Sequence, residues 1–430
     1  MKIAIAGYGV EGESNYRYWA KDSSNDITIV DEQLVPKHPL PEVAKTLLGP
    51  GVFEQLDGFD LVVRTAGLAP YKIKTDGKIW SATNEFFEKC PADIIGVTGS
   101  KGKGTTSSLI TSILEAAGKK VWLVGNIGIA AIDILDQIKP EDIVVYELSS
   151  FQLWDIESSP KTAVVLMIEQ EHLDVHKDMD EYVNAKGNIA RFQKSGDLLI
   201  YNGQNEFSIF IAHLNNQQTK VAFPSNRTTH VEGKDFYNGE QKICSVDSLQ
   251  IKGEHNISNA TAAIDAVWQY TQDATIIEQG IRSFKGLPHR LAYVKTVRGV
   301  DYYDDSIATT PGSAIAALRA FAQPKVIILG GSFKGSDFTE LAIELTKHDV
   351  QVILIGDEAP HIAKALDEVG FSSYETIENA TATAFTKRAY ELAEPGSVVL
   401  LSPSAASFGL FKNYVDRGEQ FVSAVNQLPE

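Results

Sequence analysis

The sequence has few residues that could cross-link a fold. Its 430 residues include only two cysteines, Cys90 and Cys244, so the fold does not depend on disulfides. Disulfides are rare in reducing compartments, and this scarcity predicts a cytoplasmic location. The chain is also longer than a typical single domain, which predicts two or three domains.

Long hydrophobic runs are missing as well. No apolar run comes near the roughly 18 residues that a membrane-spanning helix needs. The first residues, MKIAIAGYGVEGE, are apolar only briefly and then become acidic and rich in glycine, unlike a signal peptide. The sequence therefore predicts no membrane span.

Positive charge is scarce too. The chain has 39 lysines and arginines against 56 aspartates and glutamates, which gives a formal net charge of −17. An acidic surface argues against general binding to nucleic acid. An anionic ligand would have to be held by local lysines, backbone amides or metal ions.

The chain does contain short buried-strand patterns that alternate with helical ones. Strands are expected in KIAIA, DITIVD and FDLVVR, then in DIIGVTG, KVWLVG, DIVVYE and TAVVLMI, and finally in KVIILG, VQVILI and SVVLL. This alternation predicts parallel sheets. We expect an α/β fold of three domains: a Rossmann-like domain (1–90), a central P-loop-type ATPase domain with a mainly parallel sheet (91–286), and a Rossmann-like α/β domain (287–430). The polar stretch from about 202 to 255 is expected to be rich in turns.

A glycine-rich loop, GVTGSKGKGTTSSLI, follows the first central strand and leads into a helix that we expect to start near Thr105. Glycines at such a helix N-terminus let backbone amides approach a phosphate, and Lys103 adds a point charge. Thr105 or Thr106 could supply a hydroxyl to Mg²⁺. The spacing is not a strict Walker A motif, and the alternative is a glycine turn with solvated lysines. The predicted ATP-binding residues of the loop are Gly99, Ser100, Lys101, Gly102, Lys103, Gly104, Thr105 and Thr106.

A second glycine motif, GYGVEG, follows the first strand with G-x-G-x-x-G spacing. Asp31 ends the next strand, where a dinucleotide-binding domain would bind a ribose hydroxyl. The motif is compatible with a dinucleotide site, a site for a UDP-linked substrate, or a tight turn without a ligand.

The order of motifs resembles the Mur ligase family. The matching stretches run nearly end to end and comprise GVTGSKGKGT, GNIG, ELSSFQL, EHLD, NAKGNI, GEHNISNATAA, GLPHR, DDSIATTP, GGSFKGSDF and LSPSAASFGLFKNYVDRG. Two of them, ELSSFQL and SPSAASFGLFKN, are the most similar to the branch that adds D-glutamate to UDP-N-acetylmuramoyl-L-alanine. The resemblance implies a cytoplasmic enzyme, expected to be a monomer, that makes peptidoglycan precursors through an acyl phosphate, with ATP and two Mg²⁺ ions.

The resemblance also implies roles for four central residues. Lys103 would hold the transferring phosphate, Glu147 and His172 would bind Mg²⁺, and Lys186 would be carbamylated. Each has an alternative interpretation: a helix N-cap for Glu147, a structural histidine for His172 and an exposed helix lysine for Lys186. The predicted metal ligands are Thr105, Glu147 and His172.

Substrate contacts implied by the resemblance come from all three domains. Those to the nucleotide of ATP are Asn256, Asn259, Arg290 and Asp305. Those to the UDP-linked substrate are Val10, Glu11, Asp31, Thr65, Gly67 and Asn126. Those to the amino acid are Thr309, Lys334, Ser407 and Tyr414. The two asparagines share one helix face, although Asn at a helix start can also be a cap.

Three departures from the family pattern matter. Lys101 replaces the usual Asn, Ile307 replaces the lysine of DSKAT, and MIEQEH (167–172) replaces NVTEDH. The missing cation at 307 leaves three options: Lys334 takes its task, the acceptor is held differently, or the acceptor is not D-glutamate.

Other functions remain open from the sequence. Within ligases, the chain could add a different amino acid or lengthen a folate. A nicotinamide-dependent oxidoreductase rests on GYGVEG alone. A non-catalytic homologue is a third alternative, although Lys103, Glu147, His172 and Lys186 are all present.

Overall fold

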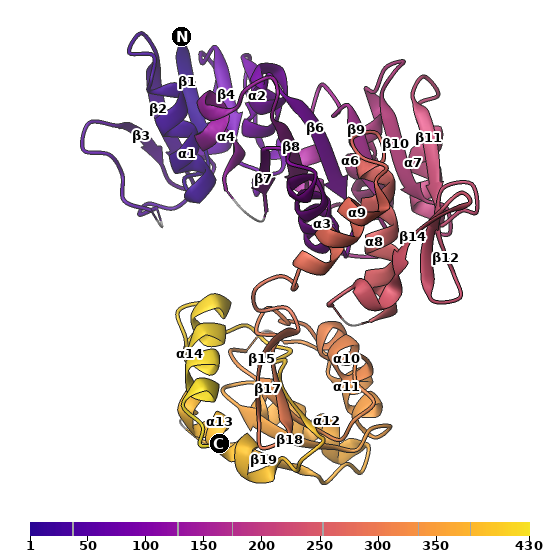
Figure 1. Cartoon of the computed structure of the whole chain (residues 1–430). Coiled ribbons are helices and arrows are strands. Elements are labelled where there is room, and N and C mark those ends of the chain that lie inside the picture. The colour runs from indigo at the N-terminus through magenta and orange to yellow at the C-terminus, as the bar shows by residue number, and fades with distance from the viewer. Residues whose placement is uncertain (37, 127–128, 174, 252, 334, 379) are drawn as a thin grey trace. The chain divides into compact units, whose positions relative to one another are not determined.

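The hydrophobic runs of the sequence form parallel sheets in a computed structural model that describes residues 1–36, 38–126, 129–173, 175–251, 253–333, 335–378 and 380–430. The chain divides into two units (Figure 1). The first unit comprises Met1–Leu249 and Glu254–Phe284, and the second comprises Gln250–Gly253 and Lys285–Glu430. Within the described ranges, no helix is long and apolar enough to cross a bilayer.

The N-terminal sheet of the first unit has the order β3-β2-β1-β4-β5, with every neighbouring pair parallel. Its strands are β1 (Lys2–Ala6), β2 (Asp26–Asp31), β3 (Lys45–Leu48), β4 (Leu61–Arg64) and β5 (Lys78–Ser81). Its helical segments are α1 (Val10–Trp19), η1 (Val52–Glu54), η2 (Pro70–Lys72) and α2 (Ala82–Lys89). The sequence predicted β1, β2 and the fully buried β4, but it missed β3 and β5, which are as short as β4 but partly exposed.

The central sheet has the order β11-β10-β9-β6-β8-β7 and is also parallel. Its strands are β6 (Asp93–Thr98), β7 (Val121–Gly125), β8 (Ile143–Glu147), β9 (Thr162–Val165), β10 (Leu198–Asn202) and β11 (Thr219–Phe223). Its helical segments are α3 (Lys103–Ala116), α4 (Ala131–Ile134), η3 (Leu135–Gln137), α5 (Ser150–Leu153), α6 (Met179–Arg191), α7 (Glu206–His213), α8 (Glu254–Val267) and α9 (Ala274–Ser283).

The stretch from 202 to 255 contains several turns, as expected, but also regular elements that the sequence did not predict. Besides α7 and β11, it forms a three-stranded antiparallel sheet of β12 (Thr229–Glu232), β13 (Asp235–Asn238) and β14 (Gln241–Ser245), followed by η4 (Val246–Ser248). Phe236 and Cys244 pair across this sheet and are both buried. The strands are short and polar on their other face, so their hydrophobic alternation is weak.

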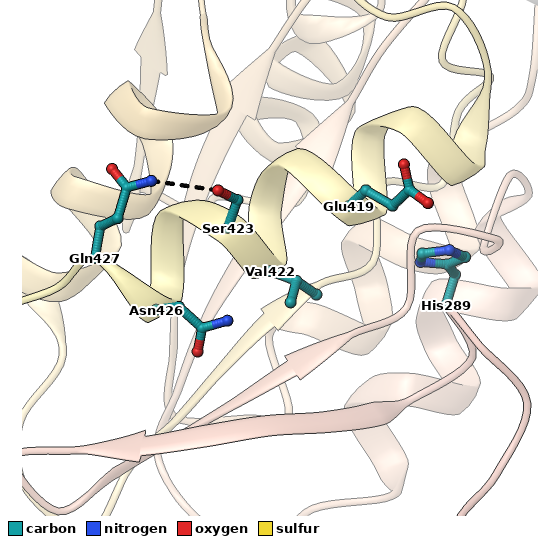
Figure 2. Close-up of a pocket in the computed structure, with 6 residues that line it drawn as sticks. All are labelled: His289, Glu419, Val422, Ser423, Asn426 and Gln427. Carbon is teal, nitrogen blue, oxygen red and sulfur yellow. Dashed lines mark hydrogen bonds between the residues drawn. The ribbon is translucent and has the colours of Figure 1, made fainter.

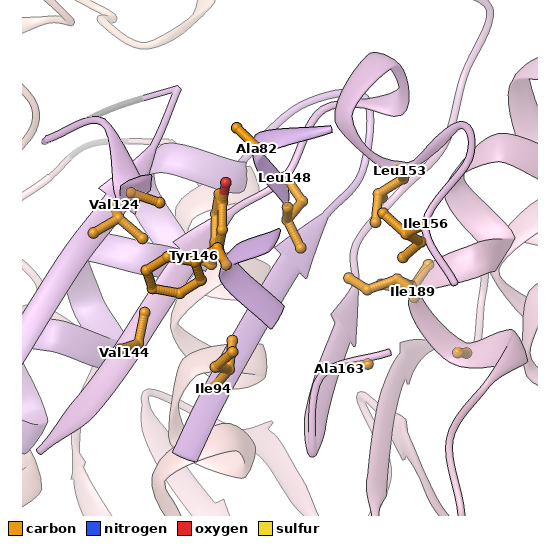
Figure 3. Packing of buried hydrophobic residues seen from close by; sticks show 14 of the residues in the cluster. Ala82, Ile94, Val124, Val144, Tyr146, Leu148, Leu153, Ile156, Ala163 and Ile189 are labelled. Atoms are coloured by element: carbon orange, nitrogen blue, oxygen red, sulfur yellow. The ribbon is translucent and has the colours of Figure 1, made fainter. Parts of the chain in front are cut away.

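One continuous hydrophobic core joins the N-terminal and central parts of the first unit. Figure 3 shows side chains from α2, the central strands and α6 packed together. Within it, the rings of Phe86 on α2 and Tyr146 on β8 meet edge to face, with centroids 5.4 Å apart. The helix that closes the first sheet therefore packs into the core of the second.

The second unit contains one sheet, ordered β15-β16-β20-β17-β18-β19, in which only β15 and β16 pair antiparallel among the described residues. Its strands are β15 (Ala292–Val297), β16 (Val300–Asp304), β17 (Lys325–Gly330), β18 (Val350–Ile355), β19 (Tyr374–Ile377) and β20 (Val398–Leu401). Its helices are α10 (Pro311–Arg319), α11 (Thr339–Leu345), α12 (Ala359–Glu368), α13 (Ala382–Leu392) and α14 (Tyr414–Asn426).

Alternate residues of β17 face opposite sides of this sheet. Ile327 and Leu329 pack in the cluster with α10, α11 and α12, whereas Val326 and Ile328 pack with α13 and α14. A strand covered on both faces reads as a continuous apolar run, which is why KVIILG was recognisable in the sequence.

The domain bounds 1–90, 91–286 and 287–430 stay a prediction. The first unit holds both of the first two expected domains, and the short segment Gln250–Gly253 belongs to the second unit.

The contact between α9 and α3 yields a test of the packing. A Cβ on Gly280 would lie 2.4 Å from the Cα of Ile113, so Gly280→Ala must separate the two helices. We expect the free energy of unfolding in urea to fall by about 1–3 kcal/mol. The control Gly312→Ala, on α10, has no neighbour within 4 Å of the new Cβ and should be neutral or stabilising by about 0.5–1 kcal/mol. Equal midpoints for Gly280→Ala and the wild type would contradict this packing.

Candidate functional site

Three strand ends meet at one edge of the central sheet. Val97 of β6 pairs with Glu147 of β8, and Thr98 of β6 pairs with Val165 of β9. The glycine loop follows β6, Glu147 ends β8, and the segment with His172 follows β9. Because parallel strands place their carboxyl ends together, these three segments lie side by side.

The glycine loop passes directly into α3, which begins at Lys103, two residues before the predicted start. Gly102 precedes it with a φ of 87°, a left-handed conformation that glycine adopts without strain. A Cβ at this position would lie 2.3 Å from the Oδ1 of Asn259. The loop therefore touches α8, and the close contact leaves room only for glycine.

Two lysine side chains converge on one carbonyl of this loop. The Nζ of Lys103 donates to the backbone oxygens of Gly99 (3.0 Å) and Ser100 (2.8 Å), and the Nζ of Lys186 donates to that of Gly99 (2.8 Å). Only 1% of Lys186 is exposed, so the interpretation of an exposed helix lysine is wrong. Burial lowers the pKa of Lys186 well below its usual value, and the charge of Lys103 lowers it further.

Oxygen donors lie at the same edge. Glu147 is buried at the end of β8, and the N-cap of α5 is Ser149, so Glu147 does not act as that cap. Thr105 and Thr106 are buried in the first turn of α3, and the Oγ1 of Thr106 has no hydrogen-bond partner. In the described part of the chain, no three His, Cys, Asp or Glu side chains gather around a metal position. A metal ion here would therefore take further oxygens from phosphate or water.

His172 has a φ of 57°, and its ring packs 5.0 Å from that of Phe151 on α5. Its Nε2 lies 3.8 Å from the Oε2 of Glu171. The His172 side chain is exposed and therefore accessible to a ligand.

Tyr182 links this segment to the loop and was missed in the sequence. Its hydroxyl lies 2.9 Å from the Oγ of Ser100 and 3.4 Å from the Oε2 of Glu171, and its ring lies under the Nζ of Lys186 at 4.6 Å. The available signal was its spacing on α6, one turn before Lys186. Tyr182 therefore helps to fix the buried lysine.

Lys101 neither lies free in solvent nor reaches into the loop. Its Nζ forms a salt bridge of 2.5 Å with the Oε1 of Glu169, another departure from the family pattern. The Oγ of Ser100 also donates to the backbone oxygen of Glu169. Lys101 and Glu169 both depart from the family pattern, and each balances the charge of the other at the rim of the loop.

Asn256 and Asn259 are both buried on α8, and the Nδ2 of Asn259 donates to the Oδ1 of Asn256. Asn259 thus lies against the loop. Asn126 is exposed after β7, and its backbone N–H donates to the backbone oxygen of Glu147 at 3.4 Å. All three lie near the loop or the end of β8, and their substrate contacts stay predictions.

The GYGVEG turn is built at the carboxyl edge of the N-terminal sheet. Both oxygens of Asp31 accept backbone N–H groups, from Tyr8 (2.7 Å) and Gln33 (2.8 Å), so Asp31 fastens the turn. A Cβ on Gly12 would lie 2.1 Å from the backbone oxygen of Gly7, so the last position of the G-x-G-x-x-G motif needs a glycine. Val10 is exposed at the start of α1.

Glu11 joins this turn to the next one. Its Oε2 accepts the N–H of Ala66 (2.8 Å), and burial raises the pKa of the Glu11 carboxyl. Thr65 donates from its Oγ1 to the backbone oxygen of Ala6, and Gly67 follows in the same turn. The structure thus brings Glu11, Thr65 and Gly67 together.

The second unit gathers its predicted residues at the carboxyl edge of its sheet. Asp305 is buried and accepts from the Oγ of Ser402 (2.7 Å) and the N–H of Leu291 (3.1 Å), and burial raises its pKa to about 7. Arg290 is exposed, and its positive charge lowers the pKa of Asp305, against the effect of burial.

Arg417 was missed in the sequence. It is fully buried on α14 and donates to the backbone oxygens of Ser306 (2.8 Å) and Ala405 (3.2 Å). Arg417 therefore joins two segments. One is the turn with Ile307 that leads to Thr309, and the other is the loop that leads to Ser407. Tyr414 joins the same network, because its backbone oxygen accepts from the Oγ of Ser306. The predicted amino-acid contact Lys334 lies outside the described residues.

A surface hollow beside α14 borders these residues, because the ring of His289 in its lining lies 6.2 Å from that of Tyr414. Figure 2 shows its lining, which consists of His289, Glu419, Val422, Ser423, Asn426 and Gln427. None of the predicted site residues is among them. His289 turns its Nδ1 toward the Oδ2 of Asp304, 2.6 Å away.

Sequence comparison matches two family profiles to the chain. That of the Mur ligase middle domain covers residues 97–267, and that of the Mur ligase glutamate ligase domain covers residues 289–405.

Two relatives carry the name UDP-N-acetylmuramoylalanine--D-glutamate ligase. The protein from Acetivibrio thermocellus is 37% identical over 454 aligned positions, covering 99% of this chain and 96% of that protein. The protein from Clostridium tetani is 37% identical over 397 positions, covering 89% and 86%.

Solved structures share the fold at low identity. The UDP-N-acetylmuramoylalanyl-D-glutamyl-2,6-diaminopimelate--D-alanyl-D-alanyl ligase from Acinetobacter baumannii has a TM-score of 0.64 and 17% identity, with coverage of 99% of this chain and 93% of that one. Folylpolyglutamate synthase from Mycobacterium tuberculosis has a TM-score of 0.60 and 14% identity, with coverage of 81% and 95%. Taken with the relatives of higher identity, these findings mean that the chain belongs to the Mur ligase family, whose enzymes use ATP to form amide bonds.

Proposed function

We propose that the protein joins D-glutamate to UDP-N-acetylmuramoyl-L-alanine and so makes peptidoglycan precursors in the cytoplasm, as a monomer. The observation that carries the proposal is the convergence of Lys103 and Lys186 on the carbonyl of Gly99, beside Glu147. Such a site suits a reaction whose transition states gather negative charge. The substrates are those in the names of the relatives.

The chemistry has two steps. A carboxylate oxygen of the L-alanyl group attacks the γ-phosphorus of ATP, so that an O–P bond forms and the bond to ADP breaks. The amine of D-glutamate then attacks the acyl phosphate. The tetrahedral intermediate loses phosphate and a proton, which leaves the amide. Lys103 would stabilise the phosphoryl group during transfer, and the amides of the glycine loop would bind its oxygens.

The residues at the loop fit Mg²⁺, which prefers oxygen ligands. Glu147 and Thr105 would hold one ion, and His172 beside Glu171 would hold a second. The buried, unpartnered Oγ1 of Thr106 supports an oxygen-rich ligand at this position. When bound, Mg²⁺ neutralises phosphate charge and orients the oxygens for transfer.

Lys186 would serve this site as a carbamate. Addition of CO₂ requires a neutral amine, and burial favours that form by lowering the pKa of the Lys186 amine. The product is an anion, which relieves the repulsion between Lys186 and Lys103 and supports a bound cation.

A second candidate is a Mur-type ligase with another acceptor amino acid. The observation that favours it is Ile307, because an uncharged side chain stands where the family pattern has a lysine. A folate-lengthening enzyme has less support, since folylpolyglutamate synthase shares the fold at 14% identity only. An oxidoreductase finds no support beyond the GYGVEG turn.

Removal of the Lys103 charge tests the mechanism. In Lys103→Ala, we expect kcat for ADP release in the presence of both substrates to fall by at least about 100-fold, since the transferring phosphoryl group loses its cation. The matched control is Lys119→Ala, an exposed lysine beyond the end of α3, which should keep wild-type turnover. Unchanged kcat in Lys103→Ala would refute the mechanism.

Carbamylation of Lys186 is tested with labelled bicarbonate. We expect a carbamate signal in ¹³C NMR of the wild type that is missing from Lys186→Arg, whose guanidinium stays protonated. Lower pH protonates the amine, so the signal and the bicarbonate-dependent part of turnover should both decline as pH falls. A wild-type spectrum without the signal at neutral pH would rule the modification out.

An acceptor panel tests the substrate assignment. With UDP-N-acetylmuramoyl-L-alanine and ATP, we expect D-glutamate to be preferred, and a preference for L-glutamate or an uncharged residue would reject it. Ile307→Lys should lower KM for D-glutamate about tenfold by adding one charged hydrogen bond, whereas Ile307→Met should not.

A further inference from the structure

Arg64, like Arg417, is among the largest fully buried side chains in the described part of the chain, with an exposed fraction of 0%. It ends β4 in the N-terminal sheet. None of the roles discussed so far uses it. A buried guanidinium is stable only when its donors are matched, so its partners show what it is built to hold.

One side of the guanidinium binds the central part of the first unit. The Nε and Nη2 atoms donate to the two carboxylate oxygens of Asp155, each at 2.5 Å, and Nη2 also donates to the backbone oxygen of Phe151 at 2.9 Å. This bidentate geometry fixes the plane of the guanidinium. Phe151 lies on α5, and its ring packs against that of His172.

The other side binds the turn after β4. Nη1 donates to the backbone oxygens of Thr65 (3.3 Å), Ala66 (3.4 Å) and Leu68 (3.1 Å). In a trans peptide, the C=O and the following N–H point in opposite directions. The N–H groups of Ala66 and Gly67 are therefore turned away from Arg64, and that of Ala66 indeed meets Glu11.

We propose that Arg64 is a positioning residue that orients the Gly67 N–H toward the uridine-nucleotide substrate and holds this turn at a fixed distance from α5. The inference rests on the proposed function, in which Thr65 and Gly67 contact that substrate. Tyr71 strengthens the same link, because its ring packs 6.0 Å from that of Trp154 and its hydroxyl donates to the backbone oxygen of Val175. Asp155 keeps the arginine in place rather than touching the substrate.

The test compares Michaelis constants in purified full-length variants. Arg64→Met removes the donors and keeps much of the volume. We expect its KM for UDP-N-acetylmuramoyl-L-alanine to rise at least about tenfold while KM for ATP stays within about twofold. The matched control is Arg17→Met, since Arg17 also comes from the N-terminal part and pairs with an aspartate of the central part, Asp133. It should leave both constants unchanged.

Two further variants separate positioning from folding. Arg64→Met leaves the carboxylate of Asp155 without its cation, so the double variant Arg64→Met/Asp155→Asn should recover thermal stability but not KM. Arg64→Lys keeps the positive charge but loses the planar guanidinium with its several N–H donors, so it should recover the KM for UDP-N-acetylmuramoyl-L-alanine only in part.

The outcomes are distinct. Three results would each overturn the inference but leave the proposed function intact. The first is a lowered melting temperature of Arg64→Met with both KM values unchanged. The others are full recovery of KM in the double variant and full recovery of KM in Arg64→Lys. A wild-type protein that neither binds nor turns over UDP-N-acetylmuramoyl-L-alanine in calorimetry and assay would overturn the proposed function, and this inference with it.

Discussion

Two lysine amino groups bound to one carbonyl oxygen form the constraint on which the site depends. Lys103 and Lys186 reach the backbone oxygen of Gly99 from different helices. Two cations this close repel each other, and Lys186 has also lost its water, so the arrangement favours a neutral Lys186 amine or a nearby anion. The buried carboxylate of Glu147 is such an anion, and its charge raises the pKa of Lys186, against the effects of burial and of Lys103. The loop is thus built in a state that a negatively charged ligand would complete.

The order of the strands explains why this loop lies where it does. In the central sheet the chain continues from β6 to β7 and β8 on one side, and then crosses to β9 on the other. In the first sheet, β1 likewise separates β2 from β4. Loops that follow such strands diverge and leave room for a ligand at the carboxyl edge. Both glycine motifs of the chain follow the strand at which the order reverses.

Most of the strands that the sequence predicted are nearly continuous apolar runs, as in KVIILG or DIIGVTG. Several strands were missed, because short segments interrupted by polar residues carry little signal: β3, β5, β10, β11, β15, β16, β19 and the three strands of the antiparallel sheet. The glycine loop and Lys103 were recognisable from local spacing. The burial of Lys186 and the roles of Tyr182, Arg64 and Arg417 were not, since they depend on which distant loops supply the hydrogen-bond partners.

The shared core of the first unit has a consequence for folding and for evolution. Phe86 belongs to the helix that closes the N-terminal sheet, yet its ring fills a space beside Tyr146 in the central one. A cut in the chain after Cys90 would leave apolar surface on both fragments exposed to water. The two sheets therefore form a single cooperative folding unit, and a foreign nucleotide-binding module could replace the first 90 residues only if it brought its own match for that aromatic contact.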